Sequence, residues 1–408
     1  MAQISSTGKK ILVISFQSLI KDSAAGMGRV GFEVSKILHQ HGLLQYFVVS
    51  SKGKYTTSFP SKPVSFFSRY YLFLLNTLNK YLKFKPYKFR FWQEVLFDFF
   101  CQAHITEETG LIVATNGFLK RTLAKAKKKG IKVIYIPSNP EDNYISDIVQ
   151  QEQALRNLRK TDVYTYQPRL AYYNATMQYV DEVISIFETV YTSYKQRGFP
   201  NKIVKVHGFI KPMLPDVETS YKTQTPIRRI GYIAYTVLLK GLPHLLEAWS
   251  ILQRKGYTNS LELYIAGDIE PSLNEYIQVN YAHLNNIVYL GKTSDVPGFM
   301  RQIDVLVVPS LIDGGPNTSL EAAHYAVPTI FSENCGYAAL MNANPNSCWI
   351  VPIMDAASIA TQIIWCIEHP EETYETGRNA QHALKQYNTH TFYEGIASYI
   401  INQTNGNS

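Results

Sequence analysis

The sequence predicts an α/β protein built from two Rossmann-like domains, each with a doubly wound parallel sheet. Continuous apolar runs of strand length alternate with helix-like segments in both halves of the chain, as in parallel strands that are covered on both faces. The length of 408 residues fits two domains of about 200 residues each. A polar stretch with two prolines, residues 213–226, separates the two series of strands.

The first half of the chain is the less regular one. We interpret the apolar run that starts at Ile11 as a buried strand and not as a signal peptide, because Gln17 and Ser18 interrupt it and a helix pattern follows. The expected elements are strands at 10–15, 44–50, 110–116, 131–138 and 179–187, a helix at 28–42 and a segment at 202–212 that crosses into the second domain.

The second half alternates more clearly. Strands are expected at 228–235, 261–268, 286–292, 304–310, 328–333 and 348–352, and helices at 240–256, 271–283, 296–303, 317–327 and 355–369. We place the first domain at 1–208 and the second at 209–386. The tail 387–408 contains a helix-like segment that we expect to pack on the first domain. Ligands of such sheets bind at the carboxyl ends of the strands, so a cleft between the domains is the expected site.

Composition and charge narrow the class of protein. With 46% hydrophobic and 18% charged residues, the chain is typical of a folded protein. Its net charge of +8 suits nucleic acid, an anionic membrane face or a phosphorylated substrate. No stretch reaches the roughly 18 apolar residues of a membrane span. The four cysteines form no C-x-x-C pair and have no histidines at zinc spacing, which predicts free thiols in a cytoplasmic protein.

A glycine motif, Gly26-x-Gly28-x-x-Gly31, has the spacing of the dinucleotide-binding fingerprint. A dinucleotide site needs its first glycine directly after the first strand, but here a polar insert of ten residues follows Phe16. The second strand also ends without the acidic residue that holds the ribose. NAD(P) binding is therefore disfavoured. Two interpretations stay open: a glycine loop that borders the cleft, or a plain loop with Gly31 packing its helix on the sheet.

An acidic motif in the second half carries the strongest chemistry. A strand ends in Asp313-Gly314-Gly315-Pro316, a helix begins at Asn317 or Thr318, and seven residues separate Asp313 from Glu321. One interpretation is structural, because Thr318-x-x-Glu321 has the pattern of a capping box. The other is functional, because bare glycine backbone and a helix N-terminus beside a carboxylate suit a phosphate-bearing ligand.

Around this motif the sequence resembles the retaining glycosyltransferases of the GT-B type, family 4-like (group 1), which include bacterial mannosyl- and glucosyltransferases and sucrose synthase. The hallmark of that family is E-x7-E, which Asp313-x7-Glu321 matches with aspartate in first place. The segments "KGLPHLLEAW", "LYIAGD", "VYLGKTSDVPGFMRQIDVLVVPS" and "EAAHYAVPTI" occur in the family's order. The resemblance covers about 228–370 well and the first domain weakly, through "GMGRVG".

The resemblance implies a role for each matched residue. Glu321 would hold the ribose hydroxyls of a UDP- or GDP-linked sugar, Asp313 the sugar hydroxyls, and Lys240 the diphosphate leaving group. Further donor contacts would come from Gly26, Gly28, Tyr235, Gly291, Thr293, Gly314, Gly315, Pro316, Asn317, Thr318 and Ser319. Lysine and backbone amides would stabilise the departing diphosphate, so neither a metal nor a cofactor is expected. The chain has no Asp-x-Asp, and Asp268-x-Glu270 comes nearest.

Two departures keep an alternative open. Tyr235 stands where the family usually has an arginine, five residues before Lys240, and the loop 137–143 lacks the family's histidine. Ser138 or Asn139 would take the place of that histidine on the acceptor side. The retained alternative is a catalytically silent GT-B-fold protein that binds a glycan or a protein partner. An epimerase is disfavoured because no acid and base facing the cleft can be identified.

A basic and aromatic segment, residues 61–92, bears seven cations and no acid: Lys62, Arg69, Lys80, Lys83, Lys85, Lys88 and Arg90. It is either a core helix with a solvated basic face or an interfacial segment on the anionic inner face of a membrane. The expected acceptor is a glycan, a lipid or a small molecule, and membrane contact at this segment would suit a lipid-linked one. Nucleic acid is disfavoured, since no RNA-binding motif accompanies the segment.

Overall fold

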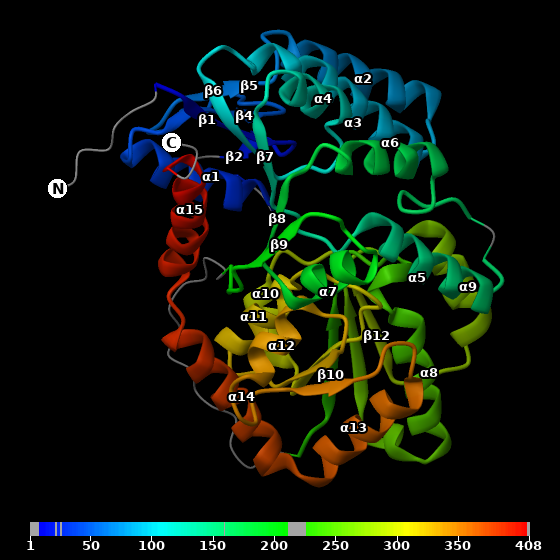
Figure 1. Cartoon of the computed structure of the whole chain (residues 1–408). Coiled ribbons are helices and arrows are strands. Elements are labelled where there is room, and N and C mark those ends of the chain that lie inside the picture. Colours follow the sequence, from blue (N-terminus) through cyan, green and yellow to red (C-terminus); the bar gives the residue numbers. More distant parts are fainter. Residues whose placement is uncertain (1–7, 21–22, 25–26, 159, 211–225, 406–408) are drawn as a thin grey trace. The chain divides into compact units, whose positions relative to one another are not determined.

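The computed structural model describes residues 8–20, 23–24, 27–158, 160–210 and 226–405. The chain forms two compact units (Figure 1). The first comprises Met1–Ile186, Val190–Val206 and His390–Ser408, and the second Phe187–Thr189 and His207–Thr389. The chain thus passes between units at 206/207, near the boundary expected at 208. Most of the proline-containing stretch 213–226 lies outside the described residues.

The first unit is built on a seven-stranded sheet in the order β5-β4-β1-β6-β7-β8-β9, with every pair parallel. Its strands are β1 (Lys10–Ser15), β4 (Leu44–Val49), β5 (Ser61–Pro63), β6 (Thr109–Ala114), β7 (Lys132–Tyr135), β8 (Glu182–Ser185) and β9 (Lys202–Lys205). In β1 the four residues from Ile11 to Ile14 are fully buried, as expected of a central strand covered on both faces.

The helices of this unit include several that the sequence analysis did not assign. They are α1 (Met27–Gln40), α2 (Ser68–Leu82), α3 (Pro86–Cys101), η1 (Gln102–His104), α4 (Lys120–Lys128), α5 (Asp142–Leu155), α6 (Gln167–Met177), α7 (Glu188–Gln196) and α15 (Thr389–Asn405). The C-terminal helix α15, red in Figure 1, belongs to this unit from His390 on. Its Tyr399 hydroxyl donates to Glu182 of β8 at 2.6 Å, and Lys132 of β7 donates to its Gln403 at 2.8 Å.

The polar insert after β1 contains a small antiparallel pair, β2 (Leu19–Ile20) with β3 (Ser23–Ala24). β1 ends at Ser15 and α1 begins at Met27, so no tight strand-to-helix turn joins them. The strand-to-helix geometry that a dinucleotide requires is therefore absent from the described residues of this connection.

The second unit has a six-stranded parallel sheet in the order β12-β11-β10-β13-β14-β15. Its strands are β10 (Arg229–Ile233), β11 (Glu262–Ala266), β12 (Ile287–Gly291), β13 (Val305–Val308), β14 (Thr329–Ser332) and β15 (Trp349–Val351). Each lies within a segment that the sequence predicted as a strand.

The helices of the second unit are η2 (Leu238–Lys240), α8 (Leu242–Arg254), η3 (Tyr257–Asn259), α9 (Pro271–Tyr281), α10 (Val296–Gln302), α11 (Asn317–His324), α12 (Gly336–Asn342), α13 (Ala356–Glu368) and α14 (Pro370–Gln386). Sequence analysis missed α12 and α14. Trp249 of α8 lies fully buried in the core, and its indole N–H donates to the carbonyl of Asn285 at 2.9 Å. The predicted fold class, two parallel-sheet α/β units with a C-terminal helix returning to the first, is confirmed.

The four cysteines are free and buried, in agreement with the expected free thiols. Among the helices that the structure describes, none combines the length and the hydrophobicity that a membrane span requires.

Candidate functional site

The strand order of the second sheet locates its ligand-binding crevice. Chain order reverses between β10 and β13, and in open α/β sheets ligands bind outside the carboxyl ends of the strands at this switch point. The connection after β10 carries Lys240, and the connection after β13 carries Asp313. The topology alone therefore brings two of the predicted catalytic residues to one place.

The backbone around Lys240 lies close to the backbone that follows β13, and this contact keeps Lys240 at the switch point. Lys240 ends the short helix η2, and Gly241 follows with a φ of +69°. A Cβ at Gly241 would lie 1.9 Å from the carbonyl oxygen of Pro309, so only glycine fits. The N–H of Leu311 donates to the carbonyl of Leu239 at 2.8 Å, which ties the two connections together.

Asp313 faces Lys240 directly. The Lys240 ammonium donates to Asp313 Oδ2, and the N–H of Gly315 donates to Oδ1 at 3.1 Å. Burial by itself would lower the pKa of Lys240, but the Asp313 carboxylate opposes burial and raises that pKa above its ordinary value. Lys240 therefore remains a cation across the physiological pH range.

Glu321 lies on α11 with its carboxylate uncompensated. Burial raises its pKa above the ordinary value, and no hydrogen bond or ion pair to another described residue offsets this. The capping-box interpretation is wrong, because α11 begins at Asn317 behind Pro316 and has no side-chain cap. Glu321 is half-buried, so its carboxylate is partly desolvated and is available to accept hydrogen bonds from a ligand.

Gly314 and Gly315 lie in a closely packed loop, which explains why residue 315 is a glycine. A Cβ at Gly315 would lie 2.6 Å from the Phe187 ring, and the carbonyl of Gly314 would lie 1.5 Å from a Cβ at Gly336. The loop is therefore pressed against its neighbours, which fixes Asp313 at its start. The isolated bridge between Asp313 and Cys335 holds the same turn.

The backbone between Gly314 and Ser319 offers fewer free donors than its length suggests. Pro316 has no N–H, and the Ser319 N–H and hydroxyl both donate to the Pro316 carbonyl, at 3.0 and 2.7 Å. Asn317, which is exposed, and Thr318, which is half-buried, occupy the first turn of α11. Amides in a first turn have no partner within the helix and point at whatever ligand binds there.

The remaining donor-side residues lie on neighbouring connections of the second unit. Tyr235 is 65% exposed in the loop after β10, two residues past the strand. Gly291 ends β12 with a φ of +63°. The Thr293 hydroxyl accepts from the N–H of Asp295 at 3.1 Å.

The glycines of the first unit are only partly described. Gly26 lies outside the described residues, whereas Gly28 is buried in the first turn of α1. A Cβ at Gly31 would lie 3.0 Å from the Phe47 ring of β4, so Gly31 packs α1 on the sheet. Ser138 is half-buried and Asn139 exposed in the loop between β7 and α5.

Two polar residues of the first unit were missed by sequence reasoning. Chain order in the first sheet reverses between β1 and β6, and Ser15 ends β1 while Asn116 follows β6. Ser15 Oγ and Asn116 Nδ2 are buried and have no hydrogen-bond partner among the described residues. Buried polar atoms are nearly always paired, so these two atoms point to a ligand or a water at the switch point.

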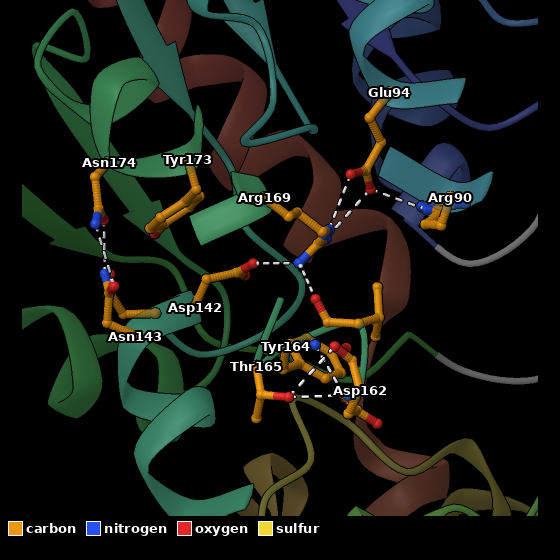
Figure 2. Close-up of polar contacts among 12 residues, drawn as sticks. Arg90, Glu94, Asp142, Asn143, Asp162, Tyr164, Thr165, Arg169, Tyr173 and Asn174 are labelled. Atoms are coloured by element: carbon orange, nitrogen blue, oxygen red, sulfur yellow. Dashed lines mark hydrogen bonds and ion pairs between the residues drawn. The ribbon is translucent and has the colours of Figure 1, made fainter. Parts of the chain in front are cut away.

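The first unit also contains a charged cluster that is fully paired (Figure 2). Arg169 of α6 donates through Nε to Glu94 of α3 at 2.9 Å and through Nη1 to Asp142 of α5 at 2.7 Å. Arg90 adds a contact to Glu94 at 2.9 Å, and the guanidinium of Arg169 lies 3.8 Å from the Phe118 ring centroid. Burial opposes the charge of Arg169, but Asp142 and Glu94 outweigh it and raise its pKa. We call these four charged residues the Arg169 cluster.

Comparisons with known proteins match part of this chain to a known family. Residues 228–369 match the family model described as Glycosyl transferases group 1. That range contains Lys240, Asp313 and Glu321 and covers most of the second unit. The fold is therefore that of GT-B glycosyltransferase structures, and the matched segment is similar to group 1 glycosyltransferases, as the sequence indicated.

Two curated relatives and one solved structure illustrate the likeness. The chain is 27% identical over 173 residues to the capsular polysaccharide biosynthesis glycosyltransferase CapM of Staphylococcus aureus, covering 41% of this chain and 44% of CapM. It is 25% identical over 253 residues to the D-rhamnosyltransferase WbpZ of Pseudomonas aeruginosa, covering 60% and 62%. The matched region thus spans less than two thirds of either relative.

The whole fold is also found in the structure of Anabaena HepE in complex with UDP and glucose. The TM-score is 0.58 at 15% identity, and the match covers 96% of this chain and 99% of HepE. At this identity the likeness establishes the fold.

Proposed function

We propose that this protein is a glycosyltransferase that moves a sugar from a nucleoside-diphosphate sugar to a hydroxyl-bearing acceptor. The observation that carries the proposal is the meeting of Lys240 and Asp313 at the switch point of the second sheet, with the uncompensated carboxylate of Glu321 on the helix that follows. The match of residues 228–369 to group 1 glycosyltransferases supports it.

Each group suits one part of such a donor. Glu321 accepts hydrogen bonds from the two ribose hydroxyls, because its half-buried carboxylate has no partner among the described residues. Asp313 accepts from hydroxyls of the transferred sugar. Lys240 and the first-turn amides of α11 bind the diphosphate.

The chemistry follows from where charge develops. When the bond between the anomeric carbon and the diphosphate oxygen breaks, negative charge grows on the leaving diphosphate. A fixed ammonium and oriented N–H groups stabilise that charge more than they stabilise the bound donor, which lowers the barrier. Lys240 is suited to stabilise this charge, because Asp313 keeps its ammonium protonated and holds it beside the loop after β13 before the donor binds.

The finer properties follow from the resemblance and are part of the proposal. Transfer proceeds with retention of anomeric configuration, and Lys240 replaces the charge that a divalent metal would supply. Binding of UDP and glucose by HepE favours a UDP-linked donor over a GDP-linked one. The acceptor is a glycan, a lipid-linked sugar or a small molecule.

The first unit supplies the acceptor side. Ser15 and Asn116 each present a buried, unpaired polar atom at the switch point of its sheet, and Ser138 and Asn139 follow the neighbouring strand β7. Hydroxyl and amide groups of this kind suit the alternating donors and acceptors of a carbohydrate.

A panel of UDP- and GDP-sugars tests the proposal. We expect at least one to raise the melting temperature of the wild-type protein and to be hydrolysed slowly without an acceptor. With an acceptor, NMR of the product reports the anomeric configuration, and activity persists in EDTA. If no nucleotide sugar stabilises the protein, or if Asp313→Ala and Glu321→Ala bind a donor as tightly as wild type, the proposal is wrong.

One observation favours a second candidate, a silent protein that binds a glycan or a protein. Tyr235 occupies the place of the second cation that the family resemblance leads one to expect on the diphosphate. Donor binding without hydrolysis or transfer to any acceptor would favour this candidate.

A further inference from the structure

An apolar stripe on α2 faces solvent. Tyr70, Leu74 and Leu78 follow each other at four-residue spacing, and Tyr81 and Leu82 continue the stripe. Each of these side chains is at least 40% exposed, and Phe66 just before the helix is 85% exposed. An amphipathic helix normally turns such a stripe toward the core, whereas this one has no partner among the residues that the structure describes.

The neighbouring helix α3 adds exposed aromatic residues. Trp92 is 42% and Phe99 52% exposed, and the Trp92 ring lies edge-on to Phe84, with centroids 4.9 Å apart. We call the exposed side of α2, α3 and the turn between them the α2–α3 face. Figure 1 shows both helices at the margin of the first unit.

The exposed charges of this face have one sign. Lys80, Lys83, Lys85 and Lys88 are exposed around the end of α2 and the start of α3. Residues 61–101 contain two acids, Glu94 and Asp98, and both are fully buried. Glu94 belongs to the Arg169 cluster. Asp98 accepts from the N–H groups of Arg121 and Thr122 at the start of α4, at 2.7 and 2.9 Å.

A groove separates α2 from α3. It has a volume of about 490 Å³ and is lined by Leu75 of α2, by Trp92, Val95, Leu96 and Phe99 of α3, and by Arg121 of α4. Its lining is apolar except for Arg121, which is an exposed residue. A slot of this kind suits a hydrocarbon chain whose anionic head group remains beside a cation.

We propose that the α2–α3 face docks on an anionic lipid leaflet and that the groove takes up part of a lipid chain. Aromatic and leucine side chains of the stripe enter the interface between head groups and acyl chains, where amphipathic helices bury their apolar side. The lysines lie at the level of the anionic head groups, with their aliphatic stems along the apolar surface. The exposed lysines of the α2–α3 face are complementary to anionic head groups, which favours a lipid leaflet over a neutral protein surface as the partner.

Flotation with vesicles tests the charge part of the proposal. We expect the protein to float with vesicles of phosphatidylcholine and 30% phosphatidylglycerol and not to float with vesicles of phosphatidylcholine alone. Replacing Lys80, Lys83, Lys85 and Lys88 together by glutamine weakens binding by a hundredfold or more, since each lysine near the surface contributes about fivefold (~1 kcal/mol). The matched control replaces Lys36, Lys54, Lys255 and Lys385, which are exposed elsewhere, and binds like wild type.

A second pair of variants tests the apolar stripe. Leu74→Ser with Leu78→Ser removes two exposed leucines and lowers binding at least tenfold, because each leucine buried in the interface contributes about 1.5 kcal/mol or more. Leu155→Ser with Val279→Ser removes two exposed apolar residues of other surfaces and leaves binding unchanged. All four changes are at exposed positions, so folding is preserved.

Fluorescence quenching tests the groove. The chain has four tryptophans, and Trp92 is the one in the groove, whereas Trp249, Trp349 and Trp365 lie in the second unit. Anionic vesicles whose acyl chains carry bromine quench the Trp92 fluorescence, and Trp92→Phe abolishes the quenching while the variant still floats.

Several results would overturn the proposal. One is the absence of flotation with anionic vesicles, and another is equal flotation of the lysine variant and its control. Flotation without any quenching assignable to Trp92 would rule out uptake of a lipid chain. Self-association that the Leu74/Leu78 variant abolishes, without vesicle binding, would assign the face to a second copy of the chain. Binding of an oligonucleotide in preference to vesicles would assign it to nucleic acid.

Discussion

The Arg169 cluster of the first unit and the Lys240, Asp313 and Glu321 group of the second unit both include residues that follow a parallel strand. The two groups differ in whether each charge has a partner within the protein. In the Arg169 cluster the carboxylates of Glu94 and Asp142 each meet a guanidinium, and Glu94, Asp142 and Arg169 are at most 8% exposed. In the second unit, Lys240 and Asp313 pair with each other, while Glu321 has no partner among the described residues.

The difference separates structural charge from functional charge. Charges that are closed off from solvent and fully paired within the protein have no capacity left for a ligand, so the Arg169 cluster holds α3, α5 and α6 together. The Lys240 side chain is 32% exposed and donates to Asp313 with one of its three N–H groups, so it can still bind a ligand. A carboxylate that burial keeps poorly solvated gains a partner when a ligand arrives. The predictions below therefore expect stability to respond at the first cluster and binding to respond at the second.

The largest effect is expected from Arg169→Met. This change leaves Glu94 and Asp142 buried without their main partner, which costs about 3–5 kcal/mol and lowers the melting temperature by about 6–20 °C. Nucleotide affinity, measured well below the transition, remains that of wild type. Lys129→Met, which removes an exposed ion pair with Glu107, is the control and shifts stability by less than about 1 kcal/mol. Equal melting temperatures of the two variants would show that the cluster is not structural.

Lys240→Ala should mainly affect the reaction. Loss of a charge-assisted contact to the diphosphate costs about 1.5–3 kcal/mol, so kcat/KM falls roughly tenfold to a hundredfold. Steady-state kinetics with the donor from the nucleotide-sugar panel measures this, with Lys255→Ala as control. A Lys240→Ala enzyme as active as its control would exclude contact of Lys240 with the leaving group.

A gain is expected from Tyr235→Arg. Residue 235 is exposed in the same connection as Lys240, so an arginine there can reach the diphosphate without disturbing the core. We expect kcat/KM to rise by up to about tenfold, the value of one charge-assisted hydrogen bond. Tyr235→Gln, which adds polarity without charge, should give no rise. If both variants raise the rate equally, charge at this position is not the cause.

The smallest effect concerns the stability of the free protein. Burial raises the pKa of Glu321 in the folded state above its unfolded value, so the ionised form destabilises the fold as pH rises through that interval. Glu321→Gln removes this cost. Its melting temperature should exceed that of wild type at pH 7, and the difference should vanish at about pH 4, below the unfolded pKa of glutamate. Calorimetry at both pH values measures it, and a difference independent of pH would contradict this explanation.

The sequence predicted the second unit well, for a physical reason. Lys240 follows strand β10 in the sequence, and Asp313 and Glu321 follow strand β13. Because the strands are parallel and their connections are short, residues that follow them lie near the carboxyl edge of the sheet. The spacing of Thr318 and Glu321 left a capping box open, and only the helix start at Asn317 decided against it.

The first unit was less predictable because its key contacts are long-range. Arg169 and Glu94 are 75 residues apart in the chain. Ser15 and Asn116 are ordinary polar residues after apolar strands, and their lack of partners is a property of the packed structure. The four-residue spacing of Tyr70, Leu74 and Leu78 is visible in the sequence, but the solvent exposure of that stripe is not.

One measurement tests the central claim most directly: calorimetric titration of the free nucleoside diphosphate into wild type, Glu321→Ala and Arg169→Met. We predict that Glu321→Ala weakens binding at least tenfold, because the ribose hydroxyls lose a charged acceptor, while Arg169→Met binds like wild type. Unchanged affinity in Glu321→Ala would contradict the assignment of the nucleotide site to the second unit's switch point.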